Sequence, residues 1–240
     1  MVASRTGRLI AVALAGCAAL SGCAAVVDGN AIKDPTVAAT PAASDSQVVT
    51  AERLPALLLD APVIASIMGA PAMAVIDHRE ETVGDSDLKI SNPRCMGAQY
   101  AGEESVYQGT GYLSFRLQRV AEPGDHFDHV VEQAVTNFVG ADAAQAFVKN
   151  VTGTWTGCAG SSLAVHFNQD NHDATWTIGQ PVSTDTSIAV LNYQEDGDGW
   201  ACQHDLAAQA NVVVEALACA KGITSQGVTV ANRILARVPE

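Results

Sequence analysis

The sequence predicts a single α+β domain in which an antiparallel β-sheet packs with amphipathic helices and is cross-linked by two intradomain disulfides. Three observations lead to this prediction. Strand patterns follow one another between Leu163 and Cys219, whereas the helical patterns lie on either side of them. Such consecutive strands are typical of α+β folds, in contrast to the alternating strands and helices of parallel sheets. Four cysteines lie between Cys95 and Cys219, and 240 residues suffice for one domain with a tail.

The beginning of the chain has the pattern of a bacterial lipoprotein signal peptide, which we assign to residues 1–22. Two arginines precede a segment without charge that runs from Leu9 to Val27. Within it, the segment Leu20–Cys23 resembles the lipobox, in which a cysteine receives a diacylglycerol group and becomes the first residue after cleavage. The segment Leu14–Cys17 has the same pattern but leaves a shorter apolar region. We therefore expect lipidation, with palmitate among the acyl chains, at Cys23.

An uncleaved transmembrane anchor is the alternative interpretation of Leu9–Val27. This segment is rich in Ala and Gly, so it would insert poorly. In both cases the rest of the chain is exported and held at the extracytoplasmic face of the cell membrane. Residues 23–50 contain no aromatic side chain and predict a lipidated N-terminus followed by a disordered tether. The globular domain is expected over residues 51–240.

Composition limits the possible partners. Apolar residues make up 48% of the chain, which is enough for a sizeable core, and the formal net charge is −13. Such an acidic protein repels polyanions, so we expect no nucleic acid partner. Instead, the expected partners are the membrane, through the N-terminal lipid, and an unknown small ligand or envelope protein.

The first half of the domain contains three predicted elements. Asp60 as an N-cap, an early proline and the terminal Gly69 predict a short helix. The alternation of apolar and polar residues over Tyr112–Ala121 predicts a strand. Apolar residues at helical spacing over Phe127–Phe138, with Asp125 as the cap, predict a second helix.

The second half contains a helix, a run of strands and a closing helix. Apolar spacing predicts a helix that begins near Phe147 and runs into Cys158. The pattern of Val228–Val238 predicts the final amphipathic helix. The strand candidates between these helices are Leu163–Phe167, Ala174–Ile178, Ser187–Tyr193, 200–208 and 212–219.

The four remaining cysteines are predicted to form two disulfides. A two-residue turn at Ala210–Asn211 joins the last two strands and places Cys202 opposite Cys219, within the distance range for a disulfide. By elimination, Cys95 then pairs with Cys158. The alternative, a metal site, lacks any pair of cysteines at the usual close spacing.

One cluster of side chains has the composition of a metal site. His126, His129 and Glu132 would share one face of the predicted helix, and imidazole and carboxylate groups suit zinc. An acidic helix start, which needs no metal, is the simpler interpretation and the one we adopt. These three residues are therefore only weak candidates, and we expect neither a metal nor another cofactor.

Two further segments resemble functional motifs without completing them. Asp196–Gly199 is similar to the start of a calcium loop but lacks the further oxygen ligands, so it predicts a hairpin turn. The segment Cys158–Ser162 does not match the nucleophile elbow of hydrolases. His204 and Trp200 could line a cleft near the cross-linked hairpin, although a histidine in a strand often faces solvent.

Three features together resemble the PknH-like extracellular sensor domain of actinobacterial membrane proteins. They are Trp155-x-x-Cys158, the strand from Asn211 to Cys219 and the closing helix. This family sits outside the membrane on receptor Ser/Thr kinases and also occurs alone in mycobacterial-type lipoproteins. The resemblance covers roughly residues 51–240 and implies two disulfides in the order given above, a cleft, and the sensing of a ligand. The chain itself contains no kinase motif.

The sequence therefore predicts a membrane-anchored extracytoplasmic lipoprotein whose globular domain binds or senses an unidentified ligand or partner. No catalytic residue is assigned, because the chain shows no recognisable nucleophile and its six histidines are scattered. The alternative is an extracytoplasmic hydrolase with an unrecognised site built from His and Asp. A purely structural role in the envelope is the third possibility.

Overall fold

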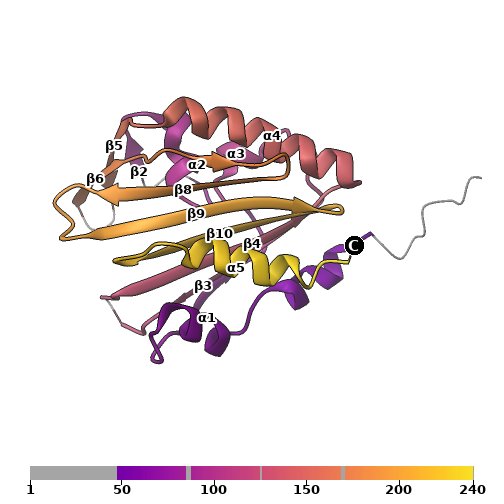
Figure 1. Cartoon of the computed structure of the whole chain (residues 1–240), viewed down its shortest axis with the longest axis horizontal. Helices are drawn as coiled ribbons and strands as arrows, with labels where there is room; N and C mark the ends of the chain where they lie inside the picture. The colour runs from indigo at the N-terminus through magenta and orange to yellow at the C-terminus, as the bar shows by residue number, and fades with distance from the viewer. Residues whose placement is uncertain (1–47, 85–87, 125, 169–170, 240) are drawn as a thin grey trace, which may run out of the picture. The chain divides into compact units, whose positions relative to one another are not determined.

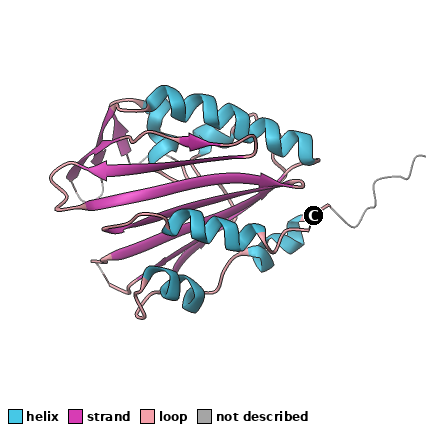
Figure 2. Ribbon diagram, in the orientation of Figure 1, coloured by secondary structure: helices cyan, strands magenta, loops and turns pink. Residues whose placement is uncertain are grey.

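A β-sheet of ten strands forms the middle of the domain in the computed structural model, which describes residues 48–84, 88–124, 126–168 and 171–239 (Figures 1 and 2). The strand order is β1-β3-β4-β10-β9-β8-β6-β5-β2, β7 pairs with β8, and every pairing is antiparallel. The strands are β1 (Ala74–Arg79), β2 (Leu88–Ile90), β3 (Ser114–Ala121), β4 (His129–Asn137), β5 (Ser162–Phe167), β6 (His172–Thr177), β7 (Val182–Ser183), β8 (Ser187–Gln194), β9 (Trp200–Gln209) and β10 (Val212–Lys221). The predicted α+β class is confirmed.

Helices cover both faces of this sheet, and each face has its own hydrophobic core. The helices α1 (Ala61–Met68) and α5 (Gln226–Leu235) pack on one face together with the 3-10 helix η2 (Ala51–Leu57). The long helix α4 (Ala141–Cys158) covers the other face. The same face carries the short segments η3 (Pro93–Cys95), α2 (Met96–Gln99) and α3 (Glu104–Tyr107). Within the described ranges, none of the helices is long and apolar enough to cross a membrane.

Most of the predicted elements form where the sequence placed them. The helix α1 follows Asp60 and ends at Gly69, whose φ of 70° is the left-handed conformation that glycine adopts without strain. The predicted strand over Tyr112–Ala121, the helix that ends at Cys158 and the closing helix are all present. The strands β1, β2 and β7 and the short segments η2, η3, α2 and α3 were not predicted.

The prediction of a helix over Phe127–Phe138 is wrong, because this segment forms the strand β4. It lies between β3 and β10, so both of its faces are covered by neighbouring layers and all residues after His129 are buried. In such a central strand the usual alternation of apolar and polar residues is lost. The apolar residues then also match a helical period, while β-branched residues such as Val130 and Val131 favour the strand. The proposed cap, Asp125, lies outside the described residues.

The two intradomain disulfides of the predicted fold are present, as Cys95–Cys158 and Cys202–Cys219. The second joins directly opposed residues of β9 and β10, whose Cα atoms are 4.0 Å apart. The connecting turn at Ala210–Asn211 sets this register, and Ala210 has a φ of 48° there.

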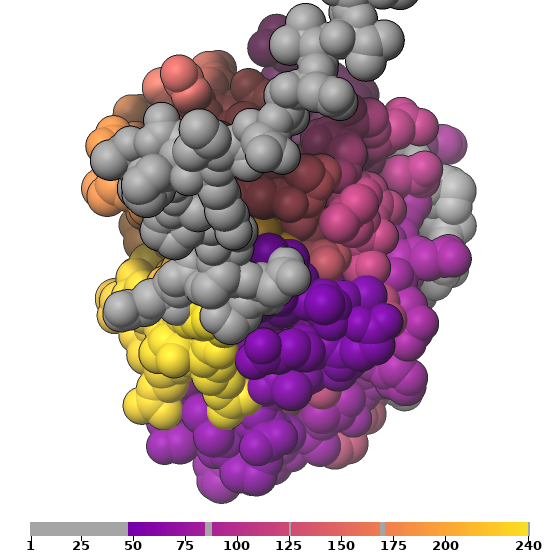
Figure 3. All heavy atoms as spheres, turned by 90° about the vertical axis from the view of Figure 1, so that its right-hand side faces the viewer, coloured from indigo at the N-terminus to yellow at the C-terminus, as the bar shows by residue number. Residues whose placement is uncertain are grey.

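The N-terminal part of the described chain is held at the same turn. The amide of Val49 donates to Asn211 Oδ1 (2.8 Å), and the carbonyl of Val49 accepts from the side-chain amides of Asn137 and Asn211 (3.0 Å each). The first described segment and the C-terminal helix lie side by side there, indigo and yellow in Figure 3. The predicted signal peptide, Cys17, Cys23 and the predicted tether up to residue 47 lie outside the described residues.

Candidate functional site

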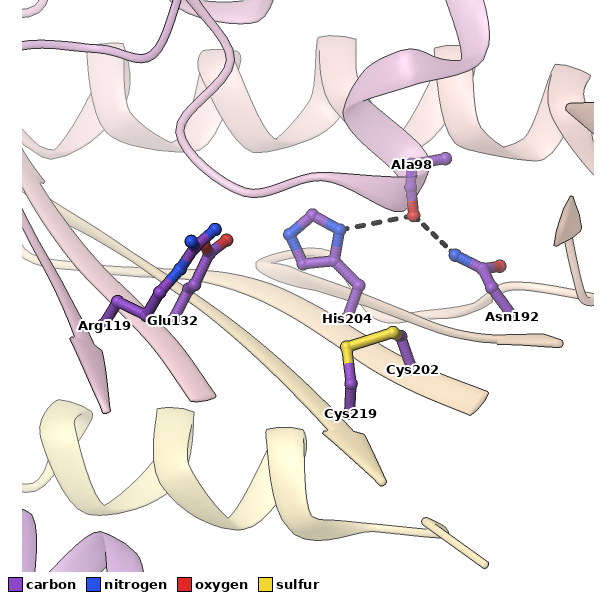
Figure 4. The surroundings of a disulfide bond; sticks show 7 residues. All are labelled: Ala98, Arg119, Glu132, Asn192, Cys202, His204 and Cys219. Carbon is purple, nitrogen blue, oxygen red and sulfur yellow. Dashed lines mark hydrogen bonds and ion pairs between the residues drawn. A yellow bond between two sulfur atoms is a disulfide. The ribbon is translucent and has the colours of Figure 1, made fainter. Parts of the chain in front are cut away.

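The antiparallel register brings a set of polar side chains together on the face of the sheet that α4 covers. One row across the sheet is formed by Arg119, Glu132, Leu217 and His204, which are paired in turn between β3, β4, β10 and β9. The neighbouring row contains the disulfide Cys202–Cys219. Figure 4 shows Arg119, Glu132 and His204 of this row projecting from the strands toward the overlying helical segment, with the disulfide beside them.

Two buried side chains of the sheet hold the end of α2 through a single carbonyl group. Asn192 Nδ2 donates to the Ala98 carbonyl oxygen at 2.8 Å, and His204 Nδ1 donates to the same oxygen at 3.3 Å (Figure 4). Both side chains are fully buried, so these bonds are shielded from water. Because Ala98 is fixed, the next two residues, Gln99 and Tyr100, take defined positions above the sheet.

A second buried group, Glu215, holds the following part of the same segment. Its Oε2 accepts from the Tyr107 hydroxyl (2.6 Å) and from the Gly102 amide (3.0 Å), and its Oε1 lies 2.9 Å from His204 Nε2. Burial, together with the negative charge of Glu215, raises the pKa of Tyr107. With Cys95 bonded to α4, the segment 95–107 is therefore tied to the rest of the domain at four points.

A cavity of about 150 Å³ lies between this segment and the sheet, and we call it the disulfide cavity. It is lined by Gln99, Tyr100, Arg119, Phe127, Val130, Glu132, Trp176, Trp200, Cys202, Leu217 and Cys219. Three of its buried polar atoms have no hydrogen-bond partner among the described residues: Gln99 Oε1, Tyr100 Oη and Trp176 Nε1. Burial raises the pKa of Tyr100, while the neighbouring Trp176 indole partly offsets this effect without reaching hydrogen-bond geometry. Unpartnered polar atoms in a cavity are free to bind a ligand.

A second cavity, of about 270 Å³, adjoins the first, and we call it the outer cavity. The two share Tyr100, Arg119 and Glu132 as lining residues. At this junction Arg119 Nε donates to Glu132 Oε1 at 2.7 Å, and the carboxylate raises the pKa of the guanidinium. Asp77 and Arg79 form a further ion pair (2.9 Å) at the rim of the outer cavity.

The two cavities together suit a small, partly aromatic or amphipathic ligand with polar groups. Aromatic rings from Tyr100, Trp176 and Trp200 provide apolar contact surface, and the unpartnered atoms provide a few directional hydrogen bonds. Of the described residues, no serine, threonine or lysine lines the disulfide cavity, and its two cysteines are bonded to each other.

The structure separates the three weak metal candidates. The helix that would have aligned them is the strand β4, in which positions 129 and 132 point to opposite faces. His129 Nδ1 pairs with Glu122 (2.7 Å), Glu132 pairs with Arg119, and His126 precedes the strand. Among the described residues there is no group of three or more His, Cys, Asp or Glu that could hold a metal ion.

The other sequence candidates occupy structural positions. Asp196–Gly199 forms the turn between β8 and β9, and Asp198 there pairs with Lys221. Ser161 donates its hydroxyl hydrogen to the Cys158 carbonyl (2.6 Å) at the end of α4. Trp200 lines the disulfide cavity as suggested, whereas His204 is fully buried and does not face solvent.

The residues that sequence reasoning missed are Gln99, Tyr100, Arg119 and Trp176. The first two follow a helix of only four residues, which has no detectable period. Arg119 could have been found from its position opposite Glu132, because oppositely charged residues facing each other on adjacent strands are a recognisable pair. That signal required β4 to be recognised as a strand.

The comparisons with known proteins agree on one family. The PknH-like extracellular domain family matches residues 49–237. The chain is 35% identical over 192 residues to the serine/threonine-protein kinase PknH of Mycobacterium tuberculosis and to that of Mycobacterium bovis. The match covers 80% of this chain but only about a third of those kinases, 30% and 32% of their lengths.

A solved structure supports the same assignment. The crystal structure of the extracellular domain of PknH from Mycobacterium tuberculosis matches with a TM-score of 0.76 and 35% sequence identity. The match covers 80% of this chain and 97% of that domain. By sequence and by fold, this chain belongs to the PknH-like extracellular domain family.

Proposed function

We propose that this protein is an extracytoplasmic sensor or binding module, tethered to the cell membrane by a lipid on Cys23, whose ligand occupies the disulfide cavity and extends into the outer cavity. The observation that carries the proposal is the set of buried, unpartnered atoms of Gln99, Tyr100 and Trp176 in one cavity. Leaving such groups without a partner costs about 1–3 kcal/mol each, and a ligand that pairs with them recovers this free energy.

The shape of the site supports binding in preference to turnover. The segment 95–107 is fixed over the sheet by a disulfide and by buried hydrogen bonds, so the cavity exists before the ligand arrives. Preformed sites of this kind lose little conformational entropy on binding. The two ion pairs balance most of the charge around the cavities, so an uncharged or weakly charged amphipathic ligand fits them best.

Native mass spectrometry of the full chain, extracted in mild detergent from its own cell envelope, tests the ligand proposal. We expect a non-covalent adduct that is released unchanged on denaturation. Trp176→Phe keeps the ring but removes the indole N–H, so the occupancy of the adduct should fall about tenfold. Tyr193→Phe, at an exposed position of β8, is the matched control and should keep full occupancy. A protein that carries no adduct, or equal occupancy in both variants, would contradict the proposal.

A further inference from the structure

A third cavity, of about 410 Å³, lies between α4 and the η3–α2–α3 segment, and we call it the helix cavity. Its lining residues are Pro93, Arg94, Gly97, Ser105, Val106, Thr110, Phe147, Asn150, Val151, Thr154 and Trp155. None of them lines the disulfide cavity or the outer cavity. Its volume lies within the range of small-molecule sites, about 300–1,000 Å³. The helix cavity is therefore a separate candidate site.

One wall of the helix cavity carries a buried donor that has no acceptor. Trp155 is 1% exposed, and its indole Nε1 has no hydrogen-bond partner among the described residues. The ring cannot turn away easily, because it packs against the buried imidazole of His204, with a centroid distance of 4.5 Å and an angle of 38° between the two ring planes. An indole N–H can only donate, so the missing partner must be a hydrogen-bond acceptor.

The charged residue in the lining indicates that the acceptor is negatively charged. Among the described residues, Arg94 is the only charged one that lines the helix cavity, although the chain as a whole carries a formal charge of −13. Arg94 and Gly97 are three residues apart on a continuous helical turn and therefore share one face. A Cβ atom at Gly97 would lie 4.0 Å from Trp155 Nε1, so this face is the one beside the indole. A cation and a neutral donor thus border the same side of the cavity.

The remaining walls are suited to an apolar group. Phe147 and Val151 of α4 and Val106 of α3 line the cavity with their side chains. The hydroxyl groups of Thr110 and Thr154 already donate to the carbonyls of Tyr107 and Asn150. The lining therefore offers an apolar floor, an Arg and a Trp donor, and the polar residues Ser105 and Asn150.

We propose that the helix cavity is a second ligand site and that it binds a small amphipathic carboxylate. The carboxylate accepts a hydrogen bond from Trp155 Nε1 and pairs with the Arg94 guanidinium, while the apolar part packs on Phe147 and Val151. An arginine suits this role because its planar guanidinium matches the geometry of a carboxylate. The site is independent of the disulfide cavity, so either one can be occupied alone.

Hexanoate, hexanamide and hexylamine, which share a chain length but differ in charge, test this proposal. The full chain is placed in phosphatidylcholine nanodiscs, so that no free detergent competes, and empty nanodiscs are the reference. Calorimetry should show hexanoate binding about tenfold more tightly than hexanamide, as expected for a charge-assisted hydrogen bond, with no binding of hexylamine. The NMR signal of the Trp155 indole proton, assigned with Trp155→Phe, should move on hexanoate addition, while those of Trp176 and Trp200 stay in place.

Two charge variants complete the test. Arg94→Gln should remove the preference for hexanoate over hexanamide. Lys149→Gln removes an equal charge from an exposed position of α4 that does not line the cavity, and it should change nothing. The proposal is overturned if hexanoate does not bind, if hexylamine binds equally well, or if the Trp176 signal moves in place of the Trp155 signal. Equal effects of the two charge variants would also overturn it.

Discussion

Glu215 and Asp205 are buried carboxyl groups of the same sheet that differ in their hydrogen-bond partners. Glu215 is 2% exposed and is surrounded by the hydroxyl of Tyr107, the amide of Gly102 and the imidazole of His204. These contacts hold the side chain of Glu215 in place, and it positions the segment that covers the candidate site. Asp205 is 5% exposed and makes no hydrogen bond or ion pair with another described residue. Burial raises its pKa to about 6, and the nearby His204 only partly offsets this.

This pKa predicts a stability that falls as the pH rises. The folded-state pKa of Asp205 lies above its unfolded value of 3.8, so the folded protein binds more protons between these two pH values. The favourable effect of the protonated group is complete below about pH 4 and is lost as the pH rises through 6. We expect Asp205→Asn to gain up to about 3 kcal/mol of unfolding free energy relative to the parent protein between pH 4 and pH 7.

Urea unfolding of both proteins at several pH values measures this difference. At each pH the unfolding free energy of the parent protein is subtracted from that of the variant. Only the pH dependence of this difference reports on the titration of Asp205, because the other effects of the substitution do not vary with pH. A difference that stays the same from pH 4 to pH 7 would show that Asp205 does not titrate in this range.

A helix or strand could be predicted from the sequence where residues close together in the chain determine it, and not where distant contacts do. The β9–β10 hairpin and its register could be predicted because a two-residue turn at Ala210–Asn211 determines both. The helix α4 could be predicted because one of its faces is buried and its period is clear. The strand β4 could not, because burial on both faces removes the alternation that marks a strand.

The same error concealed the candidate site. Glu132 was interpreted as part of a helical row with His126 and His129, whereas the register of β3 and β4 places it opposite Arg119. The segment 95–107 was also beyond sequence reasoning, because its position follows from contacts distant in sequence, such as the bond between Asn192 and Ala98. The cysteines could be paired from the sequence, so the cross-links were predicted, whereas the disulfide cavity beside Cys202–Cys219 was not.

The two disulfides should differ in their effect on stability. Cys95–Cys158 spans 63 positions and fixes a segment that no strand ladder holds, whereas Cys202–Cys219 spans 17 positions within a paired hairpin. The chain-entropy relation gives about 4 kcal/mol for the first and about 3 kcal/mol for the second. Because the hairpin already restrains its own cysteines, the measured gap should be wider.

Replacing both cysteines of each disulfide by alanine gives two comparable variants, because all four cysteines are buried to a similar degree. Urea unfolding of the Cys95→Ala/Cys158→Ala variant should show the larger loss of unfolding free energy. The Cys202→Ala/Cys219→Ala variant should retain most of the stability. An equal loss, or the reverse order, would contradict this account of how the segment 95–107 is held.

At the scale of the whole molecule, the attachment of the N-terminal segment is part of the folded domain. Val49 is fully buried, and its amide and carbonyl are bonded by the side chains of Asn137 and Asn211. A chain that leaves the domain at this point is bonded to the end of the central strand β4 and to the turn between β9 and β10. The formal charge of −13 also keeps such a domain away from an anionic lipid surface.

The proposed lipid on Cys23 is then what holds the protein at the membrane. Each methylene group of a buried acyl chain contributes about 0.8 kcal/mol, so a diacylglycerol with two long chains gives stable attachment. Cys23→Ala should therefore move the full chain from the detergent phase to the aqueous phase in a Triton X-114 partition, or leave it unprocessed. Cys17→Ala is the matched control, because on our assignment Cys17 is removed with the signal peptide, and it should partition like the parent protein. Mass spectrometry that finds an unmodified Cys23 within an intact N-terminal segment would contradict the lipid anchor while leaving both cavities, and the ligands proposed for them, untouched.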